Sequence, residues 1–390
     1  MHLDLFLSAA VGIAALLLGK FLNGKIPFLG RVCIPAPVSG GIVVALLLWA
    51  LHSFCGIDVE FDLTLKDISM TLFFTAVGFQ SDFGVLKKGG RPLLIMVALV
   101  AVLITAQNLL GTFLCREMDL PPLLGLAAGS ITLVGGHGTA GGFTPLLVEH
   151  GLEAAGTLTM AAATFGLVAG SLMGGPIAEM LIKRRKLSPE VPGSSKFEEE
   201  ALTERKGDNL MKGCFELIAA AGIGSLLSLL LKKTGMVFPA YFGALFTAII
   251  IRNASELIPG CPKPEMHSIT RLGHICLQLF LGIAMVSLKL WELAGLALPL
   301  AAILLLQCLM TALFCIFAAF PLLGRNYDAA LLVSGLCGFG LGSTPNAMAN
   351  MSAVCSKYRP SAMPFLVVPL VGGVFLDIIN ALLITAFLNF

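Results

Sequence analysis

Long apolar segments recur along almost the whole chain, separated by short polar or glycine-rich stretches. The hydrocarbon core of a bilayer is about 30 Å thick, so a helix needs about 20 mainly apolar residues to cross it. The segments of this kind cover residues 3–20, 35–54, 66–83, 92–114 and 157–182, then 214–231, 236–256, 270–288, 296–320 and 360–388. The pattern predicts an all-α integral membrane protein with two sets of five transmembrane helices.

A polar stretch, residues 183–212, separates the two sets. We expect it to be a cytoplasmic linker between a first repeat, 1–182, and a second repeat, 213–390. An odd number of crossings in each half places the second half upside down relative to the first. The order Gly-x-Gly-Thr/Ser at 136–139 also returns at 340–343, the same distance along the chain for each residue. The chain is therefore predicted to contain two inverted-topology repeats.

Two glycine-rich segments, 121–150 and 328–352, lie between the fourth and fifth predicted spans of each half. A glycine inside a helix costs about 1 kcal/mol relative to alanine. Backbone that leaves a helix at membrane depth must be buried in protein or line a polar cavity. Paired interruptions in two halves are typical of the binding site of a secondary transporter. We expect two re-entrant loops whose tips meet near the membrane midplane, although small residues also serve close helix packing.

Composition narrows the class of protein. The chain is 57% hydrophobic and 12% charged, against about 25% charged residues in soluble domains. The net charge of +2 and the solvated basic linker give no case for nucleic acid. There is no Gly-x-x-x-x-Gly-Lys-Ser/Thr phosphate-binding run and no zinc or nucleophile constellation, so we expect no enzyme and no ATP-driven pump. Transport would be passive or driven by an ion gradient.

The distribution of Lys and Arg predicts the orientation. Cytoplasmic loops of membrane proteins are enriched in these residues. Placing 183–212 in the cytoplasm puts most of the 25 Lys and Arg residues on that side and leaves an acidic outer loop around Asp58, Glu60 and Asp62. Both termini are then predicted to lie outside.

The candidate substrate-binding groups come from the two glycine-rich segments. Unpaired backbone N–H groups at helix ends attract anions, and small hydroxyls add hydrogen bonds without a permanent charge. The first segment supplies Ser130, Thr132, Gly136, His137, Gly138 and Thr139; the second supplies Gly340, Gly342, Ser343, Thr344 and Asn346. His137 has an equally plausible structural role.

Asp377 is the strongest single candidate because apolar residues flank it on both sides. An aspartate at the bilayer centre costs about 2.5–3.5 kcal/mol, so such residues usually face a partner or a pathway. Asn380 follows three residues later on the same helix face. Carboxylate and amide oxygens suit a hard cation, so Asp377, Asn380 and Asn350 are candidate Na⁺ ligands. A substrate amino group is another possible partner for Asp377, and a purely structural hydrogen-bonded Asp is the alternative.

The two glycine motifs, Gly129-Ser-Ile-Thr-Leu-Val-Gly-Gly-His-Gly-Thr-Ala-Gly-Gly142 and Gly338-Phe-Gly-Leu-Gly-Ser-Thr-Pro-Asn-Ala347, resemble those of bacterial sodium/glutamate symporters. The resemblance covers essentially the full length. It implies uptake of L-glutamate with Na⁺ across the bacterial inner membrane. It also implies a homodimer, embedded in membrane lipid, in which a mobile domain slides against a scaffold.

Other functions stay open at this stage. A citrate- or dicarboxylate-type Na⁺ symporter has the same architecture, and a cation/proton antiporter could use Asp377 as its titrating group. A channel or a structural membrane protein is a further possibility. No Arg lies in a predicted span to pair with the side-chain carboxylate of glutamate. For glutamate, which carries a net charge of −1, cotransport of two or more Na⁺ would make uptake electrogenic.

Overall fold

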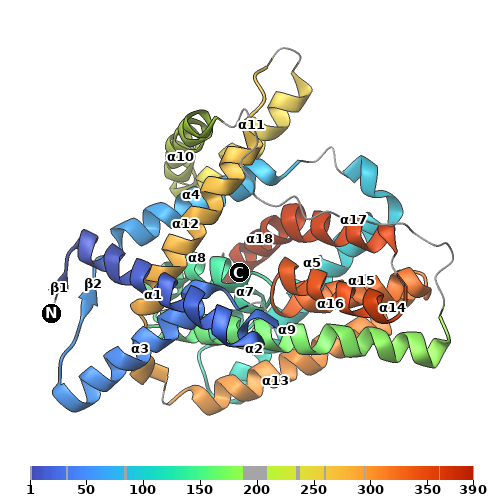
Figure 1. Cartoon of the computed structure of the whole chain (residues 1–390), viewed down its shortest axis with the longest axis horizontal. Coiled ribbons are helices and arrows are strands. Elements are labelled where there is room, and N and C mark those ends of the chain that lie inside the picture. The colour runs from blue at the N-terminus through green and yellow to red at the C-terminus, as the bar shows by residue number, and fades with distance from the viewer. Residues whose placement is uncertain are drawn as a thin grey trace.

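The computed structural model describes residues 2–31, 34–82, 86–187, 209–233, 238–258, 261–293, 295–359 and 361–389. Most of the expected linker 183–212 lies outside these ranges. The described chain is almost entirely helical (Figure 1). Two short strands, β1 (His2–Leu3) and β2 (Glu60–Phe61), pair in parallel with His2 opposite Glu60. This pairing holds the N-terminal end against the chain that leads into the helix beginning at Thr64.

The helices follow the apolar pattern closely. The long ones are α1 (Leu5–Lys25), α3 (Ala36–Cys55), α5 (Leu86–Glu117), α9 (Ala155–Arg185), α10 (Leu210–Lys232), α12 (Met266–Val286) and α13 (Ala297–Phe314). The shorter ones are α2 (Pro27–Arg31), α4 (Thr64–Gln80), α6 (Pro122–Ala127), α7 (Ser130–Leu133), α8 (Gly136–Glu149), α11 (Phe242–Leu257), α14 (Phe320–Leu322), α15 (Tyr327–Leu341), α16 (Thr344–Lys357), α17 (Ala362–Leu370) and α18 (Leu376–Asn389). A 3₁₀ turn, η2, covers Leu290–Leu293, and π-helical turns at Cys315–Ala319 and Val371–Phe375 continue α13 into α14 and α17 into α18.

Within the described ranges, eight helical stretches are long and apolar enough to cross a membrane. They are Leu5–Lys25, Ala36–Cys55, Gly90–Glu117, Ala155–Arg185, Leu210–Leu231, Met266–Val286, Ala297–Leu322 and Met363–Asn389. The other two expected spans, 66–83 and 236–256, correspond to α4 and α11, which are 17 and 16 residues long. The prediction of an all-α, multi-pass membrane protein is confirmed, whereas the count of ten crossings stays a prediction.

The helices form two bundles (Figure 1). Helices α1, α3, α4, α10, α11 and α12 pack on one another, with α4 against α12 at the centre; we name them the α4–α12 bundle. Helices α5 to α9 and α13 to α18 form the second set, in which α9 packs against α15; we name them the α9–α15 bundle. The two bundles meet where α8 lies against α12, and this contact positions the candidate site.

Glycine pairs allow unusually close helix crossings in the α4–α12 bundle. Gly19 of α1 lies directly against Gly40 and the Ala36 carbonyl group of α3. Gly224 of α10 and Gly243 of α11 repeat this arrangement in the other half of the chain. Small residues at such crossings let two backbones approach, which is how helices associate where water provides no driving force.

We therefore expect Gly19→Ala to destabilise the α1–α3 crossing, because the added methyl group would overlap the Ala36 carbonyl oxygen. Overpacking of this kind costs about 1–3 kcal/mol. Thermal unfolding of the purified protein in lipid nanodiscs should show a melting temperature several degrees below that of the parent. Gly24→Ala in the same helix is the matched control, since a methyl group there meets nothing within 4 Å. Equal melting temperatures for the two variants would contradict the tight crossing.

Candidate functional site

The first glycine-rich segment folds as three short helices instead of one. Helix α6 ends at Ala127, α7 covers only Ser130–Leu133, and α8 begins at Gly136. Gly136 has φ of +58°, a left-handed conformation that glycine adopts without steric cost. The break therefore depends on glycine at this position. It leaves the first backbone N–H groups of α8 without helical partners.

The second glycine-rich segment is interrupted once, between α15 and α16. Helix α15 ends at Leu341 and α16 begins at Thr344, with Pro345 in its first turn. Proline is favoured there because the first-turn N–H groups have no helical partner. A Cβ atom built on Gly136 would lie 3.2 Å from the carbonyl oxygen of Gly342. The two helix breaks, which are about half the chain apart in sequence, are thus immediate neighbours.

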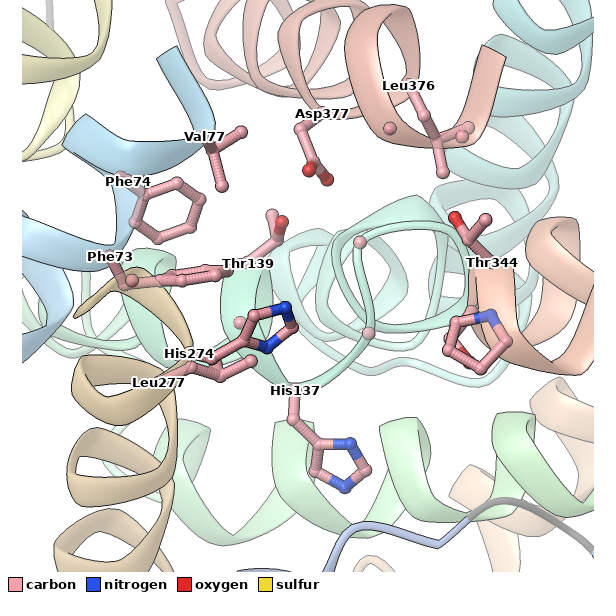
Figure 2. A pocket seen from close by; sticks show the side chains of 18 of the residues that line it. Phe73, Phe74, Val77, His137, Thr139, His274, Leu277, Thr344, Leu376 and Asp377 are labelled. Atoms are coloured by element: carbon pink, nitrogen blue, oxygen red, sulfur yellow. The ribbon is translucent and has the colours of Figure 1, made fainter. Parts of the chain in front are cut away.

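A cavity of about 350 Å³ lies beside the two breaks, between the two bundles (Figure 2). One wall consists of the starts of α8 and α16 together with the start of α18; the other consists of α4 and α12. Asp377 points into the cavity from α18 and Thr139 from α8, and Thr344 lies on the α16 side (Figure 2). The walls from α4 are mainly apolar, including Phe73 and Phe74. A few polar groups in an otherwise apolar cleft are typical of a small-molecule site.

The structure brings eight of the sequence-predicted site residues to this cavity. They are Gly136, His137, Gly138, Thr139, Gly342, Ser343, Thr344 and Asp377. The other six do not line it: Ser130, Thr132, Gly340, Asn346, Asn350 and Asn380. All six are buried, and their polar groups contact the helix breaks or the helices beside them. Their roles as direct ligands stay predictions.

The asparagine side chains attach the broken helices to their neighbours. The amide nitrogens of Asn346 and Asn350 donate to the carbonyl oxygens of Leu167 and Gly170 at 2.9 and 2.8 Å, which ties α16 to α9. The amide nitrogen of Asn380 donates to the carbonyl oxygen of Ser130 at 3.0 Å, which ties α18 to α7. These bonds connect the interrupted helices to the helices packed beside them.

The remaining predicted residues are held by the same network. Asn108 of α5 accepts the backbone N–H of Ser130 at 3.0 Å, and Gln107 donates to the carbonyl oxygen of Gly340 at 2.8 Å. The hydroxyl of Thr132 donates to the carbonyl oxygen of Ala127 at 2.8 Å. Each break is therefore braced from at least one helix of the same bundle. Bracing of this kind fixes the geometry of the groups that face the cavity.

His137 is mostly buried and occupies the edge of the site. Its Nε2 lies 3.0 Å from the hydroxyl oxygen of Thr164 on α9. In Figure 2 its ring is directed away from Asp377. This arrangement supports the structural role of His137, which helps to hold the start of α8 against α9.

Several buried oxygen atoms have no hydrogen-bond partner among the described residues. They include Oγ of Ser130, Oδ1 of Asn346 and Oδ1 of Asn380. Asn380 and Ser130 are hydrogen-bonded to each other, so the unpartnered oxygens of these two residues belong to neighbouring side chains. Buried polar atoms are normally satisfied, so these oxygens are available to water or to a cation.

The α4 and α12 wall contains residues that sequence reasoning missed, above all His274 and Thr270. His274 points into the cavity from α12 (Figure 2). One signal was available, because His274 is an ionisable residue inside the apolar segment 270–288 and such residues usually mark a pathway. Phe73 and Phe74 carried no such signal, since aromatic residues are common in any span.

An aromatic layer closes one end of the cavity. Phe74 of α4 stacks on Tyr241, with ring centroids 3.7 Å apart, and Phe143 of α8 meets Tyr241 edge to face. Gly142 faces Tyr241 and Phe74, and its neighbour Gly141 faces Phe280 of α12. The layer thus lies at the contact between the two bundles. The absence of side chains at 141 and 142 lets α8 approach it.

Two broken helices of one bundle face a second bundle across a small cavity that contains a few polar groups, in a multi-pass membrane protein, which is the organisation of a secondary transporter. The family model for the sodium/glutamate symporter matches residues 1–360, and the chain belongs to this family. It is a family of transporters and not of enzymes. The chain is 40% identical to the sodium/glutamate symporter of Escherichia coli (strain K12) over 393 aligned positions, which cover 99% of this chain and 98% of that protein. It is 39% identical to the sodium/glutamate symporter of Haemophilus influenzae, with 96% and 95% of the two chains covered.

Proposed function

We propose that this protein imports L-glutamate by symport with Na⁺ across the bacterial inner membrane. The observation that carries the proposal is the cavity beside Gly136 and Gly342, with Asp377 on the same wall as the two helix starts. The names of its relatives in Escherichia coli and Haemophilus influenzae support the same substrate and coupling ion.

The charges of the cavity complement those of glutamate. L-glutamate carries two carboxylates and one ammonium group. The N-terminal ends of α8 and α16 both reach the cavity, and the positive end of a helix dipole attracts an anionic group. The hydroxyls of Thr139 and Thr344 lie beside these ends, and Asp377 is placed to accept the ammonium group or a cation. Two helix ends, with His274 opposite, can therefore hold two carboxylates without an arginine.

The residues present also fit Na⁺. The ion prefers oxygen ligands, and the carboxylate of Asp377 and the unpartnered amide oxygen of Asn380 lie within one turn of α18. The unpartnered hydroxyl of Ser130 lies beside Asn380. Asn350 remains a further candidate at the contact of α16 with α9. Bound Na⁺ would supply positive charge next to the anionic substrate.

The net charge of glutamate favours cotransport with more than one Na⁺. Moving one net negative charge into a cell with an inside-negative potential costs about 2.3 kcal/mol for each 100 mV. Two or more Na⁺ ions per glutamate reverse the sign of this contribution, so the potential then assists uptake. We propose electrogenic symport on this ground.

We further propose that the two halves are inverted repeats and that 121–150 and 328–352 are re-entrant. The crossing of α1 with α3 through Gly19 and Gly40 has a counterpart in α10 with α11 through Gly224 and Gly243. Helices α4 and α12 hold equivalent places in the order of elements and pack on each other. The charge distribution favours a cytoplasmic linker and outer termini.

In the proposed transport cycle, the α9–α15 bundle moves against the α4–α12 bundle as an elevator. The proposal is supported by the position of the cavity between the bundles, where one wall can slide past the other. We also propose a homodimer in membrane lipid. Helix α10 exposes a row of large apolar side chains, among them Phe215, Ile218 and Leu226, that lipid or a second protomer would cover.

Uptake by purified protein in liposomes tests the function. An inward Na⁺ gradient should drive labelled L-glutamate above its equilibrium distribution, and an inside-negative potential should accelerate this uptake. Replacing Na⁺ by choline is the control. Uptake that is indifferent to Na⁺ and voltage would contradict the proposal. Strong competition of unlabelled citrate or malate with labelled glutamate would favour the carboxylate alternative, and Na⁺-driven proton movement without amino acid would favour an antiporter.

A further inference from the structure

A second cavity, of about 200 Å³, lies on the other side of the aromatic layer. It opens between the same two bundles as the first. The start of α4 and the end of α12 form one wall, and the second half of α8 with the start of α9 forms the other. Phe280 and Gly141 line it at the layer, so the aromatic residues separate the two cavities. With the linker in the cytoplasm, the second cavity faces outward.

The charged groups of this cavity are two lysines and one glutamate. Lys66 is 9% exposed, whereas Lys289 and Glu153 lie at the solvent-exposed rim. The ammonium group of Lys66 contacts the exposed carboxylate of Asp67 at 3.3 Å. An ammonium group has three N–H donors, so Lys66 can bind a further anion on its cavity side.

The other lining groups match a small polar ligand. Thr144, Thr157 and Ser287 supply hydroxyl groups, and Met160 and Leu288 form the apolar part of the wall. Two ammonium groups and one carboxylate are the charge complement of an amino acid with two carboxylates and one ammonium group. A cleft with low-dielectric walls concentrates an ion of the matching charge and raises its rate of association.

We propose that the cavity lined by Lys66, Lys289 and Glu153 is an outer binding site for acidic amino acids. It captures the substrate before the substrate passes the aromatic layer to the cavity at Asp377. This inference rests on the proposed function for the identity of the substrate and for the orientation. Lys66 and Lys289 act on association from outside and take no part in holding the substrate at Asp377.

The first test is initial uptake from outside by oriented proteoliposomes at low L-glutamate. The double variant Lys66→Gln, Lys289→Gln should lower kcat/KM by about tenfold at low ionic strength, with kcat unchanged, and high salt should remove the difference. Lys233→Gln, an exposed lysine at the end of α10 that does not line this cavity, is the charge-matched control. Lys66→Arg, Lys289→Arg should restore uptake. A kcat/KM equal to that of the control, or an equal loss for glutamate presented from inside, would overturn the proposal.

A second measurement does not depend on transport. Ser287→Cys places a thiol in the cavity wall, and its labelling by membrane-impermeant thiosulfonates is measured from outside, with the parent chain as background. The anionic reagent should react faster than the cationic one, L-glutamate should slow both, and the lysine substitutions should abolish the preference. Equal rates, no protection or labelling only from inside would overturn the site. If glutamate uptake fails while the anionic preference and protection persist, only the proposed function is contradicted.

Discussion

Asp377→Asn is expected to raise the Na⁺ concentration for half-maximal glutamate uptake by about tenfold or more, which corresponds to at least about 1.4 kcal/mol. The substitution keeps the shape of the side chain and removes its charge. Asp377 is the one carboxylate that lines the cavity at the two helix breaks in the described part of the chain. Loss of this charge leaves cations with neutral oxygen ligands only, and ligand charge sets affinity for hard cations.

The measurement is uptake into proteoliposomes at fixed L-glutamate and varied Na⁺. Asp119→Asn is the matched control, because Asp119 is exposed, lies away from the cavity and has φ of +55°, a conformation that Asn tolerates. Unchanged Na⁺ dependence in Asp377→Asn, with normal amounts of protein in the liposomes, would show that Asp377 neither binds Na⁺ nor couples it to transport.

The second large effect is expected at the contact between the bundles. Gly142→Ala should lower the uptake rate by at least about tenfold while glutamate binding is retained, because a rate depends exponentially on the barrier that the added overlap raises. The new Cβ would lie 2.5 Å from Cε1 of Tyr241 and 3.1 Å from Cε2 of Phe74. These rings are stacked and buried, so they have little room to move aside. Helix α8 would then be displaced from the surface along which we propose that it slides.

Gly175→Ala in α9 is the control, because a methyl group there meets nothing within 4 Å. Binding is measured separately by the heat of L-glutamate addition in the presence of Na⁺, which distinguishes slow movement from a damaged site. A Gly142→Ala protein that transports at the parent rate would mean that α8 does not move along the aromatic layer during transport.

Much of the fold could be predicted from hydrophobicity alone. The helices lie within a few residues of the apolar segments, because burial in lipid requires long uninterrupted apolar runs. The glycine content also indicated the two helix interruptions. Asp377 was identified because a carboxylate in an apolar segment is costly and usually faces a partner or a pathway. These features are local, so a single sequence carries them.

The site was predicted less completely than the fold, because its residues come together only when helices that are distant in sequence pack against one another. Asn346, Asn350 and Asn380 stay predicted ligands, and the structure adds a second role, because their amide nitrogens donate to carbonyl groups of neighbouring helices. An asparagine on a helix has the same sequence appearance in either role. His274 contributes from α12 in the other bundle, and only the packing of α12 against α8 brings it to the cavity.

The two cavities and the layer between them give the proposed cycle a physical path. The substrate would first meet Lys66 and Lys289 and then pass the aromatic layer. It would finally reach the starts of α8 and α16 and the carboxylate of Asp377. Each stage uses groups from both bundles. Relative movement of the bundles would therefore change the contacts between them along the path, as alternating access by rigid-body movement would do.

A density map of the protein in lipid nanodiscs with Na⁺ and L-glutamate tests the central claim most directly. The account predicts that glutamate occupies the cavity beside Gly136 and Gly342, with its carboxylates at the starts of α8 and α16, and that it disappears when Na⁺ is replaced by choline. Glutamate bound elsewhere in the Na⁺-loaded protein, with only solvent between Thr139, Thr344 and Asp377, would contradict it.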